Sequence, residues 1–219
     1  EARIAASLTT PHVAAVFDCG FHDVWTYLVM EKLVGEDLAS RLDMMGTLDP
    51  ETCAELAHEG GHVLDAVHVQ GAVHRDVSPG NLFYKQTPEG EKLVLIDFGI
   101  ARSSHASGPK LTLPGYAVGC PDFIAPEQLL GGKRLDGQTD LFSFAAVLYC
   151  ALVGSLPFDD VKRPLDRSYK SAPTARKRLL ARYPRLDPFF AKALAFDPKD
   201  RFKSGEVMAI DFHARIADR

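Results

Sequence analysis

The sequence predicts an α+β fold in which a β-rich beginning is followed by a mainly helical remainder. Two apolar runs rich in Val, Phe, Trp and Tyr, at 13–19 and 25–31, are typical of strands, and residues 72–100 are strand-rich as well. From Pro126 onward the hydrophobic spacing is helical. The predicted helices are 126–131, 137–153, 173–182, 186–196 and 204–217.

The composition is that of a globular protein. Of the 219 residues, 46% are hydrophobic and 25% are charged, and the formal net charge is −4. These values exclude a disordered chain, a fibre and a disulfide scaffold. The slightly negative net charge gives no overall positive electrostatic potential that would attract nucleic acid, and we expect no nucleic-acid partner. The four cysteines form no CxxC pair, so they are predicted to be free thiols in a reducing compartment.

The short length of the apolar stretches predicts a cytoplasmic location. The longest apolar stretch, Phe142 to Val153, is about 12 residues long, whereas a membrane span needs about 18–20. The first residue is Glu rather than Met and lies in a stretch of helical composition. We therefore expect a piece of a longer chain, in which a membrane anchor elsewhere stays open.

The first elements have recognisable start and stop signals. Residues 1–8 have helical composition, and Pro11 ends that stretch. Gly20-Phe21-His22-Asp23 separates the first two strands and predicts a hairpin turn. Gly35-Glu36-Asp37 is expected to open a short amphipathic helix that ends near Met45.

The middle of the chain is marked in the same way. Asp49-Pro50-Glu51 is typical of a helix N-cap followed by proline in the first turn, and this helix should run to about Val69. A turn at 86–90 interrupts the strand-rich region. Residues 102–121 have little periodicity, and a loop of about 20 residues inside a compact domain is usually either functional or a sign of a wrong assignment.

Three short motifs follow one another along the chain. They are His74-Arg75-Asp76-Val77-Ser78-Pro79-Gly80-Asn81, Asp97-Phe98-Gly99 and Ala125-Pro126-Glu127. Each tripeptide alone is a weak signal. In this order, with 5 residues from Asp76 to Asn81, 16 to Asp97 and 28 more to Ala125, the sequence resembles the eukaryotic-like protein kinase family, most closely its bacterial Ser/Thr branch.

The resemblance covers essentially the whole chain and implies a protein-kinase fold. Residues 1–33 would be the remnant of a β-rich N-lobe, and 34–219 a mainly helical C-lobe. It also implies ATP-dependent phosphoryl transfer to Ser and Thr hydroxyls of proteins, with ATP and Mg²⁺ bound and with autophosphorylation of the activation segment. Whether the chain forms a homodimer stays open.

The chemistry of phosphoryl transfer gives roles to the motif residues. The reaction needs the hydroxyl nucleophile positioned, the phosphate charge neutralised and the metal held. Asp76 is the candidate to accept the proton of the hydroxyl. Asn81 and Asp97 offer the hard oxygen ligands that Mg²⁺ prefers. The alternative for the two aspartates is a pair of capping residues.

The family resemblance also implies a nucleotide site around the hinge between the lobes. Backbone groups of Glu31 and Leu33 would bond the adenine ring, with Met30 at the back of the pocket and Phe83 forming its floor. Asp37 falls at the position of a ribose-contacting acid. Its alternative is a helix N-terminal acid, which the helix dipole alone favours.

Two further residues are implied to support the reaction from outside the motifs. Glu1 matches the helix glutamate that pairs with the ATP-anchoring lysine, and its alternative is an ordinary exposed helix residue. Thr112 lies where bacterial relatives carry an activating phosphothreonine, which would pair with Arg75 and order the loop. Its alternative is a plain loop threonine, and Ser103, Ser104 and Ser107 compete with it.

Three residues are expected to support the site through rigidity. Glu127 would form a buried ion pair with Arg201. Removing one partner of such a pair costs about 3–5 kcal/mol of stability. Asp140 resembles the family's anchor for the main chain of the catalytic loop.

A different motif, His58-Glu59-Gly60-Gly61-His62, spells the HExxH signature of zinc proteases. Two adjacent glycines weaken a helix, by about 1 kcal/mol each, and no third ligand motif follows. A solvated helix face is the better interpretation.

The sequence departs from the family at the centre of the site. Ser78 stands where Ser/Thr kinases usually carry a lysine that meets the transferred phosphate, and Cys120 stands in place of the usual threonine. Gly80 excludes the arginine of the tyrosine-kinase alternative. These residues leave open a pseudokinase that acts as a scaffold or binding module. A small-molecule kinase of related fold is disfavoured by the Ala125-Pro126-Glu127 motif, because that region docks a peptide in protein kinases.

Overall fold

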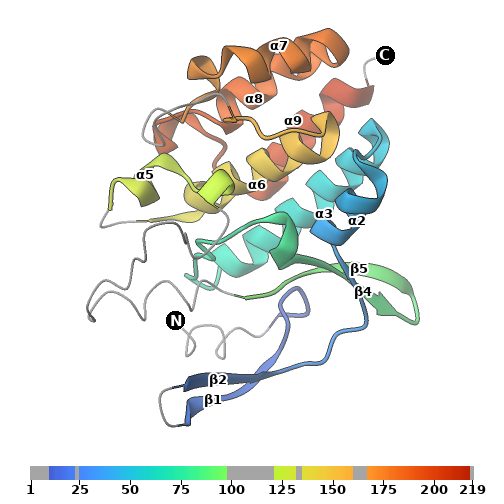
Figure 1. The fold of residues 1–219 in the computed structure, drawn as a ribbon, viewed down its shortest axis with the longest axis vertical. Coiled ribbons are helices and arrows are strands. Elements are labelled where there is room, and N and C mark those ends of the chain that lie inside the picture. The colour runs from blue at the N-terminus through green and yellow to red at the C-terminus, as the bar shows by residue number, and fades with distance from the viewer. Residues whose placement is uncertain (1–9, 23–24, 98–120, 132–134, 160–166, 218–219) are drawn as a thin grey trace.

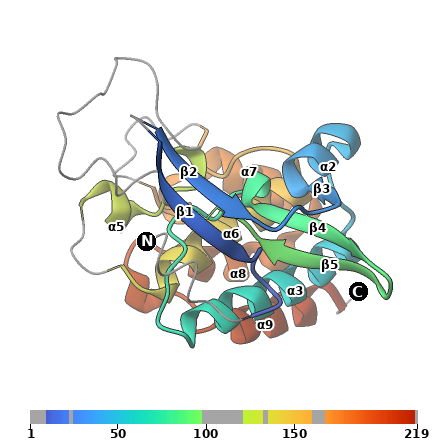
Figure 2. The ribbon, with the colours of Figure 1, turned by 90° about the horizontal axis from the view of Figure 1, so that it is seen from below.

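Strands gather at one end of the molecule and helices fill the rest (Figure 1). The computed structural model describes residues 10–22, 25–97, 121–131, 135–159 and 167–217. The sheets are a two-stranded hairpin and a three-stranded antiparallel sheet, and Figure 2, seen from the strand-rich end, shows both in front of the helices. The predicted α+β fold is therefore confirmed.

The hairpin consists of β1 (Val16–His22) and β2 (Trp25–Met30). Pairing continues to His22 opposite Trp25, so the expected turn at Gly20–Asp23 is wrong in its extent, because 20–22 belong to the strand. Gly20 pairs with Tyr27, and a Cβ on this glycine would lie 2.6 Å from the Tyr27 hydroxyl. The tyrosine ring covers the glycine, which therefore serves the strand and not the turn.

The second sheet has the order β3 (Gly35–Asp37), β4 (Leu82–Thr87) and β5 (Gly90–Leu95). The expectation that 35–37 open a helix is wrong for the first two residues, which pair with β4. Gly35 has φ 141°, and a Cβ there would lie 1.9 Å from the Tyr84 carbonyl oxygen. Only glycine allows so close a strand approach, which could not be foreseen without the pairing partner.

The helices begin and end close to their predicted bounds. Helix α2 is Leu38–Met45, α3 Pro50–His68, α5 Pro126–Leu129, α6 Gly137–Val153, α7 Pro173–Arg182, α8 Asp187–Ala193 and α9 Gly205–Ala217. Short 3-10 turns are η1 Pro79–Asn81, η2 Pro121–Phe123, η4 Tyr169–Ser171, η5 Pro184–Leu186 and η6 Pro198–Asp200. The expected helix at 1–8 and the aperiodic loop lie outside the described residues, apart from Pro121.

Aspartates fix the starts of the long helices. Asp49 accepts hydrogen bonds from the Glu51 and Thr52 amides, and Asp136 accepts one from the Gln138 amide. Each cap satisfies donors that the first helical turn leaves unpaired. Helix α9 is capped from another element, because Asp65 in α3 accepts the Gly205 and Glu206 amides at 2.7 and 2.8 Å.

The core lies between α3, α6, α8 and α9. Helix α6 is buried almost on all sides, which its continuous apolar sequence predicts. Phenylalanines of several elements meet there: Phe189, Phe190, Phe202 and Phe212 have ring centroids 4.9–6.3 Å apart. Each such buried ring stabilises the fold by about 1.5–3 kcal/mol, so this cluster is a rigid base for the loops above it.

Candidate active site

Asp140, in the first turn of α6, fixes the main chain of the loop at 74–81, the candidate catalytic loop. This fully buried carboxylate accepts the His74 amide at 2.8 Å and the Arg75 amide at 2.7 Å. His68 at the end of α3 adds a contact from its Nε2 to Asp140 Oδ2 at 2.8 Å. A carboxylate that accepts main-chain amides in a buried place makes a strong, directional anchor. The sequence pointed to Asp140, whereas His68, 72 residues away, carried no signal.

Arg75 takes a backbone conformation that few residues other than glycine adopt. Its φ is 67°, and such left-handed residues persist where the surroundings hold them, often at functional sites. Besides the bond from its amide to Asp140, its carbonyl accepts the Gln128 side-chain amide at 2.8 Å. Gln128 thereby joins α5 to the loop, a role that nothing in the sequence had indicated.

His74 is buried inside the loop and links it to the end of β5. The Asp76 amide donates to His74 Nδ1 at 3.3 Å, so this nitrogen is the acceptor and Nε2 carries the proton. Nε2 then donates to the Ile96 carbonyl at 2.9 Å. Burial lowers the pKa of His74, in spite of the opposing charge of Asp140. The neutral ring therefore serves as a structural bridge.

Asp76 and Asn81 meet directly. Asn81 Nδ2 donates to the Asp76 carbonyl at 2.7 Å and to its carboxylate Oδ2 at 3.3 Å. The Asn81 amide also donates to the Ser78 carbonyl at 3.1 Å, which closes the turn η1 between them. Because Asp76 engages the amide nitrogen, the amide oxygen is the atom through which Asn81 would bind a metal ion.

Asp97 follows β5 beside the loop. The Ile96 amide donates to the Asn81 carbonyl at 3.0 Å, and the Ile96 carbonyl accepts from His74. Asp97 is thus the next residue after a position held on both sides, and its φ of 54° is again left-handed. A carboxylate and an amide oxygen on neighbouring chain segments are a donor set that fits Mg²⁺.

The segment between β2 and β3 carries main-chain polar groups. The Glu31 amide donates to the Ala15 carbonyl at 2.8 Å. Within the described part of the chain, no hydrogen bond engages the Glu31 carbonyl or the Leu33 amide. Met30, half-buried, ends β2 just before them. Lys85 of β4 forms an ion pair with the Glu31 side chain and ties this segment to the second sheet, a contact that sequence reasoning missed.

Asp37 and Phe83 lie opposite each other across β3 and β4. Asp37 caps α2, since its two carboxylate oxygens accept the Ser40 amide at 2.8 Å and the Ser40 hydroxyl at 3.0 Å. This cap is the alternative that the sequence left open. Phe83 is half-buried in the same sheet.

Glu127 and Arg201 form a bidentate ion pair with N–O distances of 2.7 and 2.8 Å. Arg201 is only 3% exposed, and its remaining donors bond the carbonyls of Ala195, Gln138 and Phe196. Thr139 donates to Glu127 Oε1 at 2.9 Å. Burial by itself raises the pKa of Glu127, but the hydrogen bonds and charge of Arg201 outweigh it and lower the pKa below its ordinary value.

The remaining predicted residues divide into two groups. Ser78 is described: it is half-buried, has an extended backbone and precedes η1. Glu1, Thr112 and Cys120 lie outside the described residues.

The HExxH motif lies on α3. His58, Glu59 and His62 are exposed, and the described part of the chain contains no cluster of three or more metal-ligating side chains. The two glycines have another purpose. A Cβ on Gly60 would lie 2.2 Å from the Phe144 ring, and one on Gly61 would lie 2.6 Å from the Gly205 carbonyl oxygen. They allow α6 and α9 to pack closely against α3.

Comparison with known proteins identifies the family. The family model of the protein kinase domain matches residues 1–213. The chain belongs to the protein kinase family. The crystal structure of the PknI kinase domain of Mycobacterium tuberculosis has a TM-score of 0.71 at 26% identity, covering 97% of this chain and 75% of that one.

Curated relatives point to the same branch that the motifs indicated. Serine/threonine-protein kinase PknD of Mycobacterium tuberculosis strain H37Rv is 34% identical over 97% of this chain. Pkn2 of Myxococcus xanthus is 34% identical over 95%, and PksC of Streptomyces coelicolor 35% over 95%. The chain spans 32% of PknD, 26% of Pkn2 and 39% of PksC. The predicted membership of the bacterial Ser/Thr protein kinases is confirmed.

Membership of this family implies ATP as the phosphoryl donor together with a divalent cation.

Among the described residues, no helix is both long enough and apolar enough to cross a membrane.

Proposed function

We propose that this chain is the core of a protein kinase that transfers the γ-phosphoryl group of ATP to Ser and Thr hydroxyls of proteins, its own activation segment included. The observation that carries the proposal is the hydrogen-bonded pair Asp76–Asn81, on a loop whose main chain Asp140 holds. The Ser/Thr protein kinase names of the relatives support it.

In the proposed reaction Asp76 orients the substrate hydroxyl and accepts its proton. The hydroxyl oxygen forms a bond to the γ-phosphorus, and the bond from that phosphorus to the bridging oxygen breaks, so that ADP leaves. Asn81 and Asp97 would hold Mg²⁺. When bound, that ion neutralises charge on the phosphate oxygens. The chain itself contributes alignment, because the bonds to Asp140 and Gln128 fix the loop before substrate arrives.

We further propose that the division of the chain falls at the hinge, with 1–33 in the N-lobe and 34–219 in the C-lobe. The Glu31 carbonyl and the Leu33 amide would bond adenine, between apolar surfaces of Met30 and Phe83. A ribose contact by Asp37 would compete with its bond to the Ser40 amide. Glu1 would pair with a lysine of the full chain.

The activation segment completes the proposal. Phosphate on Thr112 would pair with Arg75, whose exposed side chain belongs to the anchored loop. The phosphorylated and unphosphorylated states of the segment would then differ in activity.

Ser78 makes the proposed kinase slow, since a hydroxyl cannot neutralise developing phosphate charge as an ammonium does. The scaffold alternative is not favoured, because the candidate base and both candidate metal ligands are present beside their supporting residues. Autophosphorylation of the full natural chain with Mg-ATP, mapped by mass spectrometry, tests the proposal. Phosphate at Thr112 or its serine neighbours is expected. A folded chain that acquires no phosphate would support the scaffold instead.

A further inference from the structure

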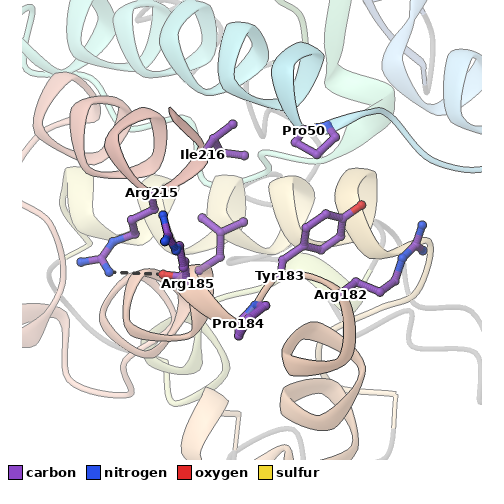
Figure 3. Close-up of a pocket in the computed structure, with 8 residues that line it drawn as sticks. Pro50, Arg182, Tyr183, Pro184, Arg185, Arg215 and Ile216 are labelled. Carbon is purple, nitrogen blue, oxygen red and sulfur yellow. Dashed lines mark hydrogen bonds between the residues drawn. The ribbon is translucent and has the colours of Figure 1, made fainter. Parts of the chain in front are cut away.

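A hollow of about 320 Å³ opens among the helices, far along the chain from the catalytic motifs (Figure 3). It lies between η5, the C-terminal turn of α9 and the start of α3 at Pro50. Two prolines, three further apolar or aromatic residues and three arginines line it. The last two groups are Tyr183, Leu186 and Ile216, and Arg182, Arg185 and Arg215. We call this site the arginine hollow.

The charges of the arginine hollow are only partly compensated. Arg215 bonds both oxygens of Asp211, at 2.7 and 3.1 Å, and donates to the Arg185 carbonyl at 3.3 Å. Arg182 and Arg185 are exposed and have no acidic partner among the described residues. The Arg182 guanidinium lies 5.5 Å from the centre of the Tyr183 ring. Two uncompensated cations therefore border an apolar floor.

Positive charge also continues beyond the arginine hollow along α7. Residues 173–185 contain five Arg or Lys and no Asp or Glu, in a chain whose net charge is −4. Arg176 pairs with Asp187 and Arg178 with Asp159. Lys177 is exposed and has no acidic partner in the described part of the chain. Lys177 thus adds one uncompensated cation on α7 outside the hollow, and a ligand that reaches it together with Arg182 and Arg185 has to be extended.

We propose that the arginine hollow binds an extended acidic segment of a partner protein, with an aliphatic or aromatic side chain on the floor and carboxylates on Arg182 and Arg185. Guanidinium groups bond carboxylates in a two-pronged geometry. Arginine and tyrosine around an apolar centre are typical of protein interfaces, and charge complementarity selects the partner. This inference does not rest on the proposed catalysis, because none of these residues belongs to the loop or hinge.

Fluorescence anisotropy of the full natural chain tests the site. The probe is a fluorescein-labelled peptide, Gly-Glu-Glu-Leu-Glu-Glu-Phe-Glu-Glu-Gly, compared with the same peptide carrying Gln for every Glu. We expect the acidic peptide to bind at least about tenfold more tightly. The double variant Arg182→Glu/Arg185→Glu should bind it about tenfold or more weakly than the natural chain does.

A matched control changes the same charge elsewhere. Lys199 and Lys203 are exposed, and Lys199→Glu/Lys203→Glu should leave peptide binding unchanged. Ile216→Ser, which removes part of the floor, should weaken binding about three- to tenfold without a change of charge. Melting temperatures of all variants verify that they are folded.

Three results would overturn the proposal: no binding of the acidic peptide, equal binding of the Gln peptide, or equal losses in the two double variants. Competition by poly(A) RNA as strong as by unlabelled peptide would also overturn it, because the surface would then be a general polyanion patch. Asp76→Asn should bind the peptide normally. Normal peptide binding without phosphate transfer in the natural chain would count against the proposed function alone.

Discussion

The candidate catalytic loop and the helical core are made rigid by opposite means. In the core, apolar side chains of α6, α8 and α9 are buried against one another, and the phenylalanine rings need no polar partner. In the loop 74–81, directional bonds to Asp140, Gln128 and Asn81 hold a main chain that is partly exposed and left-handed at Arg75. Changes in the core should therefore affect stability, and changes in the loop should affect alignment.

The largest expected effect tests the charged pair embedded in the core. Arg201→Met leaves the half-buried Glu127 carboxylate without its partner, and we expect a loss of about 3–5 kcal/mol in the free energy of unfolding. Denaturant unfolding measures it. Arg215→Met breaks the more exposed pair with Asp211 and should cost less than about 1 kcal/mol. Equal losses in the two variants would contradict the account.

The pH dependence of stability tests the same ion pair. The folded pKa of Glu127 lies below its ordinary value of 4.5, because Arg201 outweighs the effect of burial. The ion pair therefore contributes its full stability above that value and loses it as the pH falls through the folded pKa. The difference in stability between the natural chain and Arg201→Met should shrink below pH 4.5. A constant difference at lower pH would be inconsistent with the pair.

The next effect compares two aspartates that each hold two main-chain amides. Asp140→Asn places an amide group against the His74 or Arg75 amide, so phosphate transfer should fall about 100-fold through misalignment of the loop. The free energy of unfolding should fall by about 1–3 kcal/mol. Asp65→Asn disturbs the cap of α9 in the same way and should lower stability without a comparable loss of activity. Paired unfolding and transfer assays distinguish the two.

A smaller loss of stability is expected where helices pack closely in the core. Gly61→Ala forces a methyl group toward the Gly205 backbone, and overpacking should cost about 1–3 kcal/mol of unfolding free energy. Gly60→Ala meets the ring of Phe144 instead, which can shift more easily than backbone, and should cost less. Thermal unfolding of both variants measures the order. The reverse order would show that α3 and α9 are not in close contact.

The smallest expected effect lies at Ser78 in the loop. Ser78→Lys adds an ammonium group two residues after Asp76, and we expect phosphate transfer to rise about tenfold, because that charge stabilises the transferred phosphate. Ser78→Met, of similar length but uncharged, should not raise it. Initial rates with Mg-ATP measure both. A rise in neither variant would show that the chain does not depend on charge at this position.

Much of the fold was predictable because its signals are local. Asp49-Pro50 and the apolar periodicity of α6 fixed the long helices to within a residue or two of their observed ends. The strand at Gly35 was missed, since its pairing partner lies some fifty residues later. Sequence alone shows Gly60 and Gly61 only as weak helix formers, because the neighbours that require them, Phe144 and Gly205, are distant in sequence.

The candidate site shows the same division between local and distant information. Motif spacing singled out Asp76, Asn81 and Asp97, and the structure brings the first two into direct contact. The supporting contacts of His68 and Gln128 join segments 53–72 residues apart. Such contacts follow from the packing of helices against the loop, and no pattern in either segment specifies them.

The measurement that tests the central claim most directly is the effect of Asp76→Asn on both properties at once. In the full natural chain, phosphate transfer from Mg-ATP should fall about 100- to 10,000-fold, because the proton acceptor is lost. The free energy of unfolding should stay unchanged within about 0.5 kcal/mol, since the side chain is only partly buried. Transfer at the natural rate would contradict the assignment of Asp76. A large loss of stability would contradict the division of labour between loop and core.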